Sequence, residues 1–220
     1  AVDLAKPCVL INCRDEAMRL SSIAPDHRLI GQFAAQYLFD MGHRAVLNVM
    51  CLRRYTMDLR LAGIKEAWRM RNLHFTDGRD LLTVASFSAR DSEERVGEWL
   101  DARAGKSLPT AFLVGGDFMV AGTVSALQKR GLRVPQDISV MSIDGFNLAA
   151  IQDVPLTAVH VPRDELGTEA VHLLQQRLIR PGAPRGSLLL HGTLVVRDSV
   201  RRIRSGNRLT TVVQAGLYDD

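Results

Sequence analysis

Five side chains with binding chemistry follow closely on runs that predict β-strands or the turns after them. They are Asn12, Arg60, Phe87, Asp117 and Asp144. In open α/β sheets, ligands bind outside the carboxyl ends of the strands. Carboxylates and an arginine fork can bridge neighbouring hydroxyl groups, and an aromatic face can cover the apolar side of a ring. This combination predicts a small, polyhydroxylated or heterocyclic ligand.

Three of these residues also have an ordinary structural interpretation. An aspartate after a strand often caps the next helix, which applies to both Asp117 and Asp144. Phe87 could equally be a packing residue of the core. The residue types alone leave both interpretations open.

Catalysis and metal binding find little support in the sequence. Asp117 and Asp144 could form a glycosidase pair, but nothing sets their separation. Nucleophile-elbow, P-loop and dinucleotide-binding motifs are absent from the sequence, and the six histidines are scattered. We therefore expect no enzyme activity, no metal and no cofactor. His43 is expected to cap a helix end.

The elements that must position the binding residues alternate between strand and helix. Runs that favour strands are residues 9–11, 45–51, 81–85, 110–115, 138–143 and 188–196. Segments with helical periodicity are residues 26–41, 57–72, 93–103, 118–130 and 163–180. Repeated alternation predicts an α/β fold in which helices cover both faces of a parallel sheet.

Composition and charge are those of an ordinary globular chain. Of its 220 residues, 46% are hydrophobic and 24% are charged, which excludes disordered and fibrous classes. Half of the net charge of +4 comes from residues 201–220, which contain four arginines and two aspartates. This segment reads as a loose, solvated tail rather than a nucleic-acid site. No stretch is long and apolar enough for a membrane span. The three cysteines are expected to be buried, reduced thiols in a cytoplasmic protein.

Five segments resemble signatures of the LacI/GalR family of bacterial transcription regulators. They are the D-M-G-H-R-A run at 40–45, R-L-A-G at 60–63, the G-L-R-V-P-Q-D-I-S-V run with its following aspartate at 131–144, P-L-T-A-V at 155–159 and L-V-V-R-D-S at 194–199. They occur in the order and spacing of the family. The chain thus resembles the effector-binding core of such a regulator.

The resemblance implies a two-lobed, periplasmic-binding-protein-like fold of type I with parallel sheets. It places residues 1–24 and 161–190 in an incomplete amino-terminal lobe, and residues 25–160 and 191–199 in the carboxy-terminal lobe, with 200–220 as the tail. An incomplete lobe is expected to expose apolar surface and to reduce solubility or promote association.

The resemblance also implies which residues touch the effector. Arg60, Asp144, Asn12 and Phe87 match family positions that commonly do so, and Asp117 is a less secure match. Asn12 stands where an aspartate is usual, which removes a charged acceptor. The effector is expected to be a carbohydrate or a similar molecule bound between the lobes.

Family dimers imply a homodimer interface formed by Phe118, Met119, Leu148 and Ile151. The helix-turn-helix of the family has no counterpart in these residues, so operator DNA is expected to be bound only through a missing amino-terminal domain.

Two functions follow from the resemblance. The first is the effector-binding and dimerisation domain of a transcriptional regulator in the cytoplasm, in which the ligand alters operator affinity. The alternative is an exported solute-binding receptor of a transport system with the same fold. The same sensor joined to a different DNA-binding domain is a variant of the first.

Overall fold

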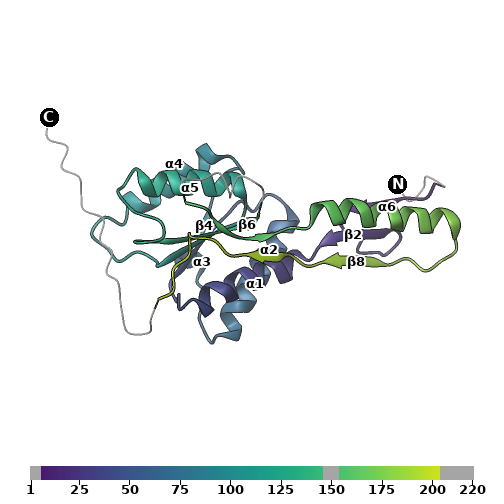
Figure 1. Cartoon of the computed structure of the whole chain (residues 1–220), viewed down its shortest axis with the longest axis horizontal. Helices are drawn as coiled ribbons and strands as arrows, with labels where there is room; N and C mark the ends of the chain where they lie inside the picture. Colours follow the sequence, from purple (N-terminus) through teal and green to yellow (C-terminus); the bar gives the residue numbers. More distant parts are fainter. Residues whose placement is uncertain (1–5, 146–153, 204–220) are drawn as a thin grey trace.

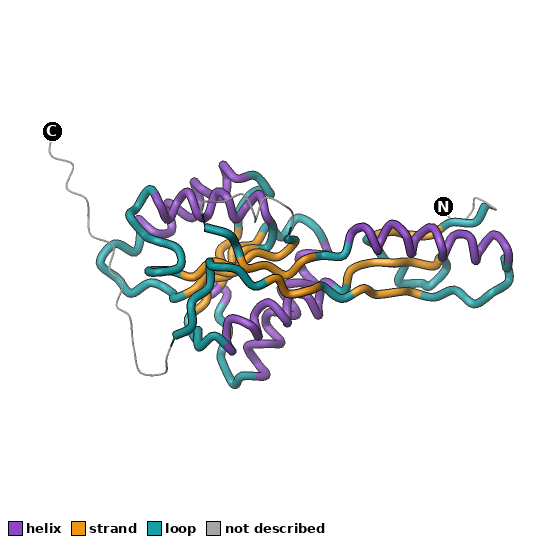
Figure 2. The backbone as a smooth tube through the Cα atoms, viewed as in Figure 1, coloured by secondary structure: helices purple, strands orange, loops and turns teal. Residues whose placement is uncertain are grey.

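The chain folds around two separate sheets. A computed structural model describes residues 6–145 and 154–203. A six-stranded sheet forms the centre of a wide part, which we call the large lobe, and a three-stranded sheet lies in a narrow part, the small lobe (Figure 1). The two lobes lie end to end, so that the molecule is elongated (Figure 2).

The sheet of the large lobe has the strand order β4-β3-β5-β6-β7-β9. Its strands are β3 (Val46–Met50), β4 (Leu81–Thr83), β5 (Ala111–Val114), β6 (Ser139–Asp144), β7 (Thr157–His160) and β9 (Thr193–Val195). All neighbours pair in parallel except β7 and β9, which are antiparallel. The central strands are apolar and buried on both sides, as expected where helices cover both faces of a parallel sheet.

Helices cover both faces of this sheet. One face carries α1 (His27–Asp40) and α2 (Tyr55–Met70), and the other carries α4 (Ala89–Asp101) and α5 (Asp117–Gln128) (Figure 1). The short α3 (Asp77–Asp80) precedes β4. The interior therefore consists of two apolar layers, one on either side of the sheet, which contain the buried Trp68 and Phe112 respectively.

The small lobe contains three parallel strands and one long helix. The strands are β1 (Val9–Ile11), β2 (Ser21–Pro25) and β8 (Ser187–Leu190), in the order β1-β2-β8. The helix α6 (Arg163–Ile179) lies along the sheet and buries Leu166 and Ala170 against Ile23. In the described part of the chain this core is small, because the sheet has one layer of helix.

Three short connections join the lobes within the described residues: β2 to α1, β7 to α6 and β8 to β9. The last of them corrects one prediction. Residues 188–196 were expected to form a single strand, but the chain leaves one sheet after Leu190 and enters the other at Thr193. Only His191, Gly192 and Thr193 interrupt the apolar residues here, and an interruption of this length also occurs within single strands.

The segment after β9 is part of the large lobe as far as residue 203, which corrects the expectation of a loose tail from residue 200. Val200 is buried in the apolar layer beneath α1 and α2. The backbone amide of Arg201 donates to Ser139 Oγ, and that of Ile203 donates to the carbonyl of Met41. These contacts attach the segment to the sheet and to the end of α1.

His43 caps the end of α1, as expected, because its backbone amide donates to the carbonyl of Leu38, and its side chain attaches the same segment. Its side chain is fully buried, and its ring nitrogens lie 2.9 Å from Thr110 Oγ1 and 3.2 Å from the carbonyl of Arg201. Gly42 precedes it with a φ of +96°, and a Cβ there would stand 2.2 Å from the carbonyl oxygen of Ile203. The Gly-His-Arg signature therefore has a structural function.

The burial of the three cysteines agrees with the prediction for only one of them. Cys51 is buried, but Cys8 and Cys13 are half-exposed, and all three are free. None of the helices in residues 6–145 and 154–203 is long and apolar enough to cross a membrane. Within the same residues, no group of histidine, cysteine and carboxylate side chains could hold a metal ion.

Candidate functional site

A cleft of about 460 Å³ lies between the two lobes. The small lobe contributes Asn12, Pro25, Arg163 and Leu166. The large lobe contributes residues from the ends of strands and the beginnings of helices: His27, Arg54, Thr56, Met57, Arg60, Phe87, Phe118, Asp144 and Val161. Four of the five predicted site residues thus line one cleft, namely Asn12, Arg60, Phe87 and Asp144. The fifth, Asp117, is not among the lining residues.

Arg60 is the centre of the hydrogen-bond network of the cleft. It belongs to α2, and only 5% of its surface is exposed. Its Nη1 donates to the carbonyl of Gly115 at 2.8 Å, and its Nη2 lies 2.5 Å from Asp144 Oδ1. Gly115 follows β5 and Asp144 ends β6, so the guanidinium spans the ends of two neighbouring strands. A buried arginine needs such partners, because an unpaired charge in the interior is strongly unfavourable.

His27 connects Arg60 to the small lobe. Arg60 Nε donates to His27 Nδ1 at 3.2 Å, so Nδ1 must be unprotonated. The proton of the neutral ring is then on Nε2, which lies 3.0 Å from Asn12 Oδ1 and donates to it. Burial, reinforced by the positive charge of Arg60, lowers the pKa of His27 from 6.5 to about 4. The ring is therefore neutral near pH 7, as the two hydrogen bonds require.

Asn12 and Asp144 both adopt positive φ angles, +56° and +131° respectively. Such angles are uncommon for residues other than glycine, and they concentrate at binding and catalytic sites. Asp144 is held there from two sides, because Arg163 Nη1 also donates to its carbonyl at 3.3 Å. The hydroxyl of Tyr55 donates to the carbonyl of Asn12 at 3.2 Å. The structure thus maintains the backbone of both residues in an unfavourable conformation at the edge of the cleft.

Phe87 has a different neighbour from the one expected. The guanidinium of Arg54 lies 4.7 Å from the centre of its ring, which is a cation–π contact. The ring also packs against both apolar layers of the large lobe. Phe87 is therefore a packing residue of the large lobe that also orients Arg54 at the cleft.

Asp117 is buried beside Ser142 of β6 and Gly145, which follows that strand. Its Oδ1 accepts hydrogen bonds from Ser142 Oγ at 2.6 Å and from the amide of Gly145 at 3.3 Å. It is the first residue of α5, where a carboxylate also interacts favourably with the helix dipole. These contacts give Asp117 a structural function next to Asp144.

The expected dimer interface requires one correction. Met119 has no exposed surface and belongs to the apolar layer beneath α4 and α5, so it cannot meet a partner chain. Phe118 is 59% exposed, but it lines the cleft. Leu148 and Ile151 lie outside the described residues. The interface therefore remains a prediction for three of the four residues.

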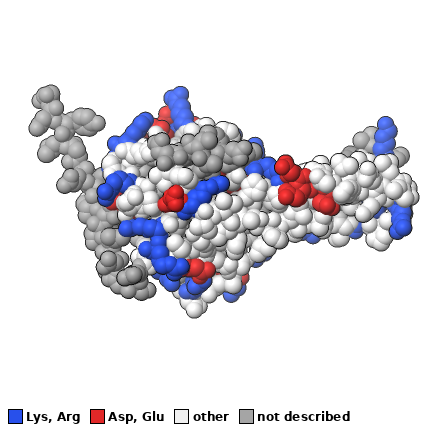
Figure 3. Space-filling model, in the orientation of Figure 1, with Lys and Arg blue, Asp and Glu red and all other residues white. Residues whose placement is uncertain are grey.

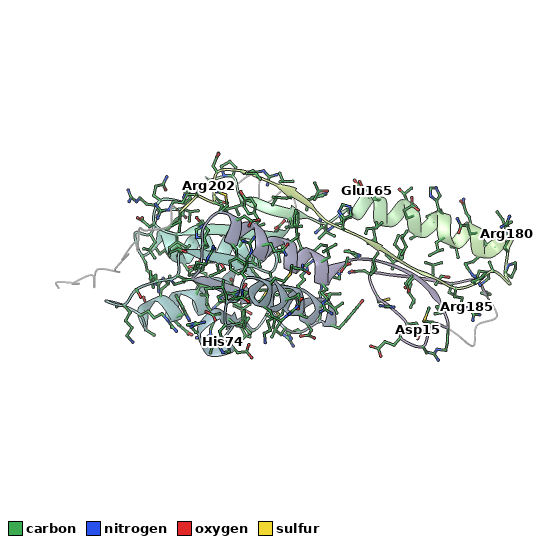
Figure 4. All side chains as sticks on the ribbon, turned by 90° about the horizontal axis from the view of Figure 1, so that it is seen from below. Asp15, His74, Glu165, Arg180, Arg185 and Arg202 are labelled. Carbon is green, nitrogen blue, oxygen red and sulfur yellow. The ribbon has the colours of Figure 1, made fainter. Side chains whose placement is uncertain are left out.

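The sequence did not identify nine of the thirteen lining residues as part of the site. Three of them are basic: His27, Arg54 and Arg163. Each stands at the beginning of a helix or just before it: His27 begins α1, Arg54 precedes α2 and Arg163 begins α6. A search for polar residues at predicted helix starts, in addition to strand ends, would have found them. Figure 4 places Glu165 at the end of α6 that faces the large lobe and Arg180 at the opposite end.

Two other hollows on the molecule have less binding chemistry. One of about 350 Å³ is lined mainly by apolar side chains of α1 and of the β8–β9 connection. The other, about 460 Å³, lies at the amino ends of β3, β4 and β5 and includes Arg79 paired with Asp80. Neither contains a predicted site residue. The interlobe cleft is therefore the candidate site.

Comparison with known proteins gives consistent results. Residues 35–200 match the family described as periplasmic binding protein-like domain. The HTH-type transcriptional repressor PurR of Histophilus somni is 30% identical over 174 residues, which are 79% of this chain and 51% of that protein. The ribose operon repressor of Escherichia coli K12 is 32% identical over 181 residues, 81% of this chain and 53% of that protein.

A solved structure shows the same fold. The LacI family transcriptional regulator from Enterococcus faecium, with bound ribose, superimposes with a TM-score of 0.78 at 22% identity and covers 90% of this chain and 71% of that one. The present chain spans about half the length of the curated relatives described above.

Proposed function

Since the chain belongs to the family of periplasmic binding protein-like domains and forms an effector-binding core of the LacI type, we propose that it binds a small polar effector between its lobes. The effector is a carbohydrate or a molecule of similar polarity. The chain acts as the sensor of a bacterial transcriptional regulator. The ribose bound to the E. faecium regulator and the name of the ribose operon repressor support this ligand class.

One observation carries the proposal: the chain of hydrogen bonds from Asn12 through His27 and Arg60 to Asp144. It begins in the small lobe and ends in the large lobe, so a ligand that contacts either end also affects how the lobes are held together. A ligand shifts such an arrangement only by its different affinities for the open and closed forms. The network provides that difference, because its polar ends border the cleft.

The regulatory function involves further proposals. We assign residues 1–24 and 161–190 to one ligand-binding lobe, residues 25–160 and 191–199 to the other, and operator binding to a domain outside these residues. The protein acts as a homodimer in the cytoplasm and binds effector without transforming it. The coding sequence upstream of residue 1 tests these assignments, because a helix-turn-helix supports the regulator, whereas a secretion signal would support an exported solute receptor.

Ligand binding tests the site itself. A library of neutral sugars, sugar acids, sugar phosphates and purine bases is screened by thermal shift, and each hit is measured by calorimetry. We expect at least one hit, and we expect Arg60→Ala to abolish its binding while the circular dichroism spectrum is retained.

Arg69→Ala is the matched control, because Arg69 lies on the same helix but is exposed and paired with Glu66. It should bind the ligand as the unaltered chain does. Binding that survives Arg60→Ala would exclude the cleft as the site.

A further inference from the structure

We infer that the effector carries an anionic group, a phosphate or a carboxylate, which Arg54 binds at the rim of the cleft. This inference rests on the proposed function and specifies its ligand class. It follows from the charges that line the cleft, from the donors and acceptors left to a ligand, and from the position of Arg54.

The charge of the lining is positive. Three arginines line the cleft, Arg54, Arg60 and Arg163, whereas Asp144 is the one carboxylate among the described lining residues. His27 adds no charge near pH 7, because burial holds its pKa at about 4. Asp144 is paired with both Arg60, at 2.5 Å, and Arg163, at 3.8 Å. A neutral sugar would add no charge to compensate that of Arg54.

Other carboxylates of the described residues near the cleft do not pair with Arg54. The side chain of Asp26 accepts a hydrogen bond from the backbone amide of Leu29 and so caps α1. Asp117 is buried and accepts from Ser142 and from the loop after β6. Asp164 and Glu165 lie in the first turn of α6, and neither is among the residues that line the cleft. Their negative charge offsets the dipole of that helix.

The hydrogen-bonding groups left to a ligand are mostly donors. Oδ1 of Asn12 accepts a hydrogen bond from His27, which leaves the side-chain nitrogen of Asn12 to donate to a ligand. Arginine side chains have only donors. A phosphate or carboxylate has only acceptors when ionised, whereas a hydroxyl group needs an acceptor for its own proton. The cleft therefore complements an anion better than a hydroxyl.

Arg54 is positioned for this task. Its guanidinium lies 4.7 Å from the centre of the Phe87 ring, and no carboxylate of the described residues forms an ion pair with it. Stacking on an aromatic ring orients the guanidinium and leaves its hydrogen-bonding edge available. Arg54 combines a defined position with an uncompensated charge.

Matched neutral and charged ligands test the inference. Calorimetry compares ribose with ribose 5-phosphate and ribonate, and glucose with glucose 6-phosphate and gluconate, with inorganic phosphate alone as a further probe. A charge-assisted hydrogen bond contributes enough that we expect a charged ligand to bind at least about ten-fold more tightly than its neutral parent. The advantage should shrink as salt is raised. Whether the phosphate or the acid binds distinguishes the two kinds of anion.

Arg54→Gln should remove this advantage, while Arg53→Gln should retain it. Arg53 is the adjacent arginine, but it donates to the carbonyl of Ala85 and does not line the cleft. Equal or tighter binding of the neutral sugars would overturn the anionic class and leave the proposed sensor intact. Binding of inorganic phosphate with the same affinity in Arg54→Gln would overturn the assignment of Arg54. If no charged ligand binds, the inference is overturned, and the wider library decides the proposed function separately.

Discussion

Arg60 donates from Nε to Nδ1 of His27, and this one hydrogen bond defines the protonation state of the histidine. The two residues are 33 positions apart and belong to neighbouring helices, α1 and α2. A protonated His27 would have no acceptor for Arg60 and would place a second positive charge beside the guanidinium. Ligand binding and acid stability are therefore linked through this pair.

The first prediction concerns stability between pH 6.5 and pH 4.5. Burial lowers the pKa of His27 and of His43 from 6.5 to about 4. The unfolded chain therefore binds protons at both histidines before the folded chain does, so the free energy of unfolding is fully present above pH 6.5 and falls as the pH falls towards 4. Urea unfolding at several pH values measures this slope.

Histidine variants identify the origin of the slope. His27→Gln and His43→Gln should each make the slope shallower, and the change in slope is compared rather than the absolute stability. Paired carboxylates such as Asp101 and Asp137, whose pKa values are lowered from 3.8, contribute to the slope mainly below about pH 5, so the variants are compared above that pH. An unchanged slope in both variants would contradict the neutral, buried histidines.

The second prediction concerns the coupling of Arg60 and Asp144. Arg60→Met leaves a half-buried carboxylate without its partner, and we expect a loss of about 3 kcal/mol in the free energy of unfolding. Asp144→Asn should cost less, and the double variant should cost less than the sum by about 1–3 kcal/mol. Additive losses in urea unfolding would mean that the short contact between the two residues contributes no coupling.

The third prediction concerns the contact between α1 and α2. A Cβ at Gly63 would stand 1.8 Å from the carbonyl oxygen of Arg28, so the two helices approach too closely for any side chain there. Gly63→Ala should destabilise the chain by about 2 kcal/mol or more, because overpacking forces the backbones apart. It should also weaken ligand binding, since Arg60 is one turn away on the same helix.

Gly167→Ala is the control for that substitution. Gly167 lies within α6, and a Cβ there would meet nothing within 4 Å. Alanine should stabilise that helix by about 0.5–1 kcal/mol, because it restricts the unfolded chain and favours the helical backbone. Equal effects of the two substitutions in thermal unfolding would contradict the close approach of α1 and α2.

The fourth prediction separates the functions of the two aspartates. Asp117→Ala leaves Ser142 Oγ and the amide of Gly145 without their acceptor. We expect a loss of about 1–3 kcal/mol in stability, because a buried donor without a partner is unfavourable. Ligand affinity should fall less than in Asp144→Ala. A larger loss of affinity in Asp117→Ala, measured by calorimetry, would show that Asp117 contacts the ligand.

The fifth prediction concerns self-association of the small lobe. Figure 3 shows few charges over much of this lobe. Its exposed large apolar side chains are Ile11, Met18, Val171, Leu178, Ile179, Leu188 and Leu189. Apolar surface of this kind promotes association. We expect sedimentation velocity to show species larger than a monomer at high concentration.

Charge on the edge strand β8 should reduce that association. Leu189→Lys places a charge on the edge of the three-stranded sheet, which opposes pairing with another strand. Leu59→Lys is the control, because Leu59 is also exposed but lies on α2 in the large lobe. A stable monomer at every concentration would contradict the prediction.

Several elements of both lobes could be predicted from local patterns. The helix predicted at 163–180 and the strand predicted at 9–11 agree with α6 and β1 almost residue for residue. Their apolar residues repeat at the period of the element, and each signal lies within a few residues. The α/β class follows from the same alternation.

Elements that depend on their neighbours were missed. The strand β2, with the sequence Ser-Ser-Ile-Ala-Pro, has weak strand propensity, but it is the central strand of its sheet, paired with β1 and β8. Hydrogen bonds from both neighbouring strands stabilise β2. One of these neighbours, β8, lies far from β2 in the sequence, so local patterns do not reveal the pairing. The break between β8 and β9 likewise depends on distant partners, because β8 pairs with β2 of the small lobe and β9 pairs with β7 of the large lobe.

The candidate site divides in the same way. Arg60 and Asp144 were predicted from their residue types and positions at the ends of elements. Their direct contact across 84 positions, and the insertion of His27 between Arg60 and Asn12, arise only when α1, α2 and β6 pack together. Local sequence can determine where a helix or strand ends, because that depends on nearby residues. The partner of a buried charge depends on which distant segments share the space around it, and only the folded chain decides that.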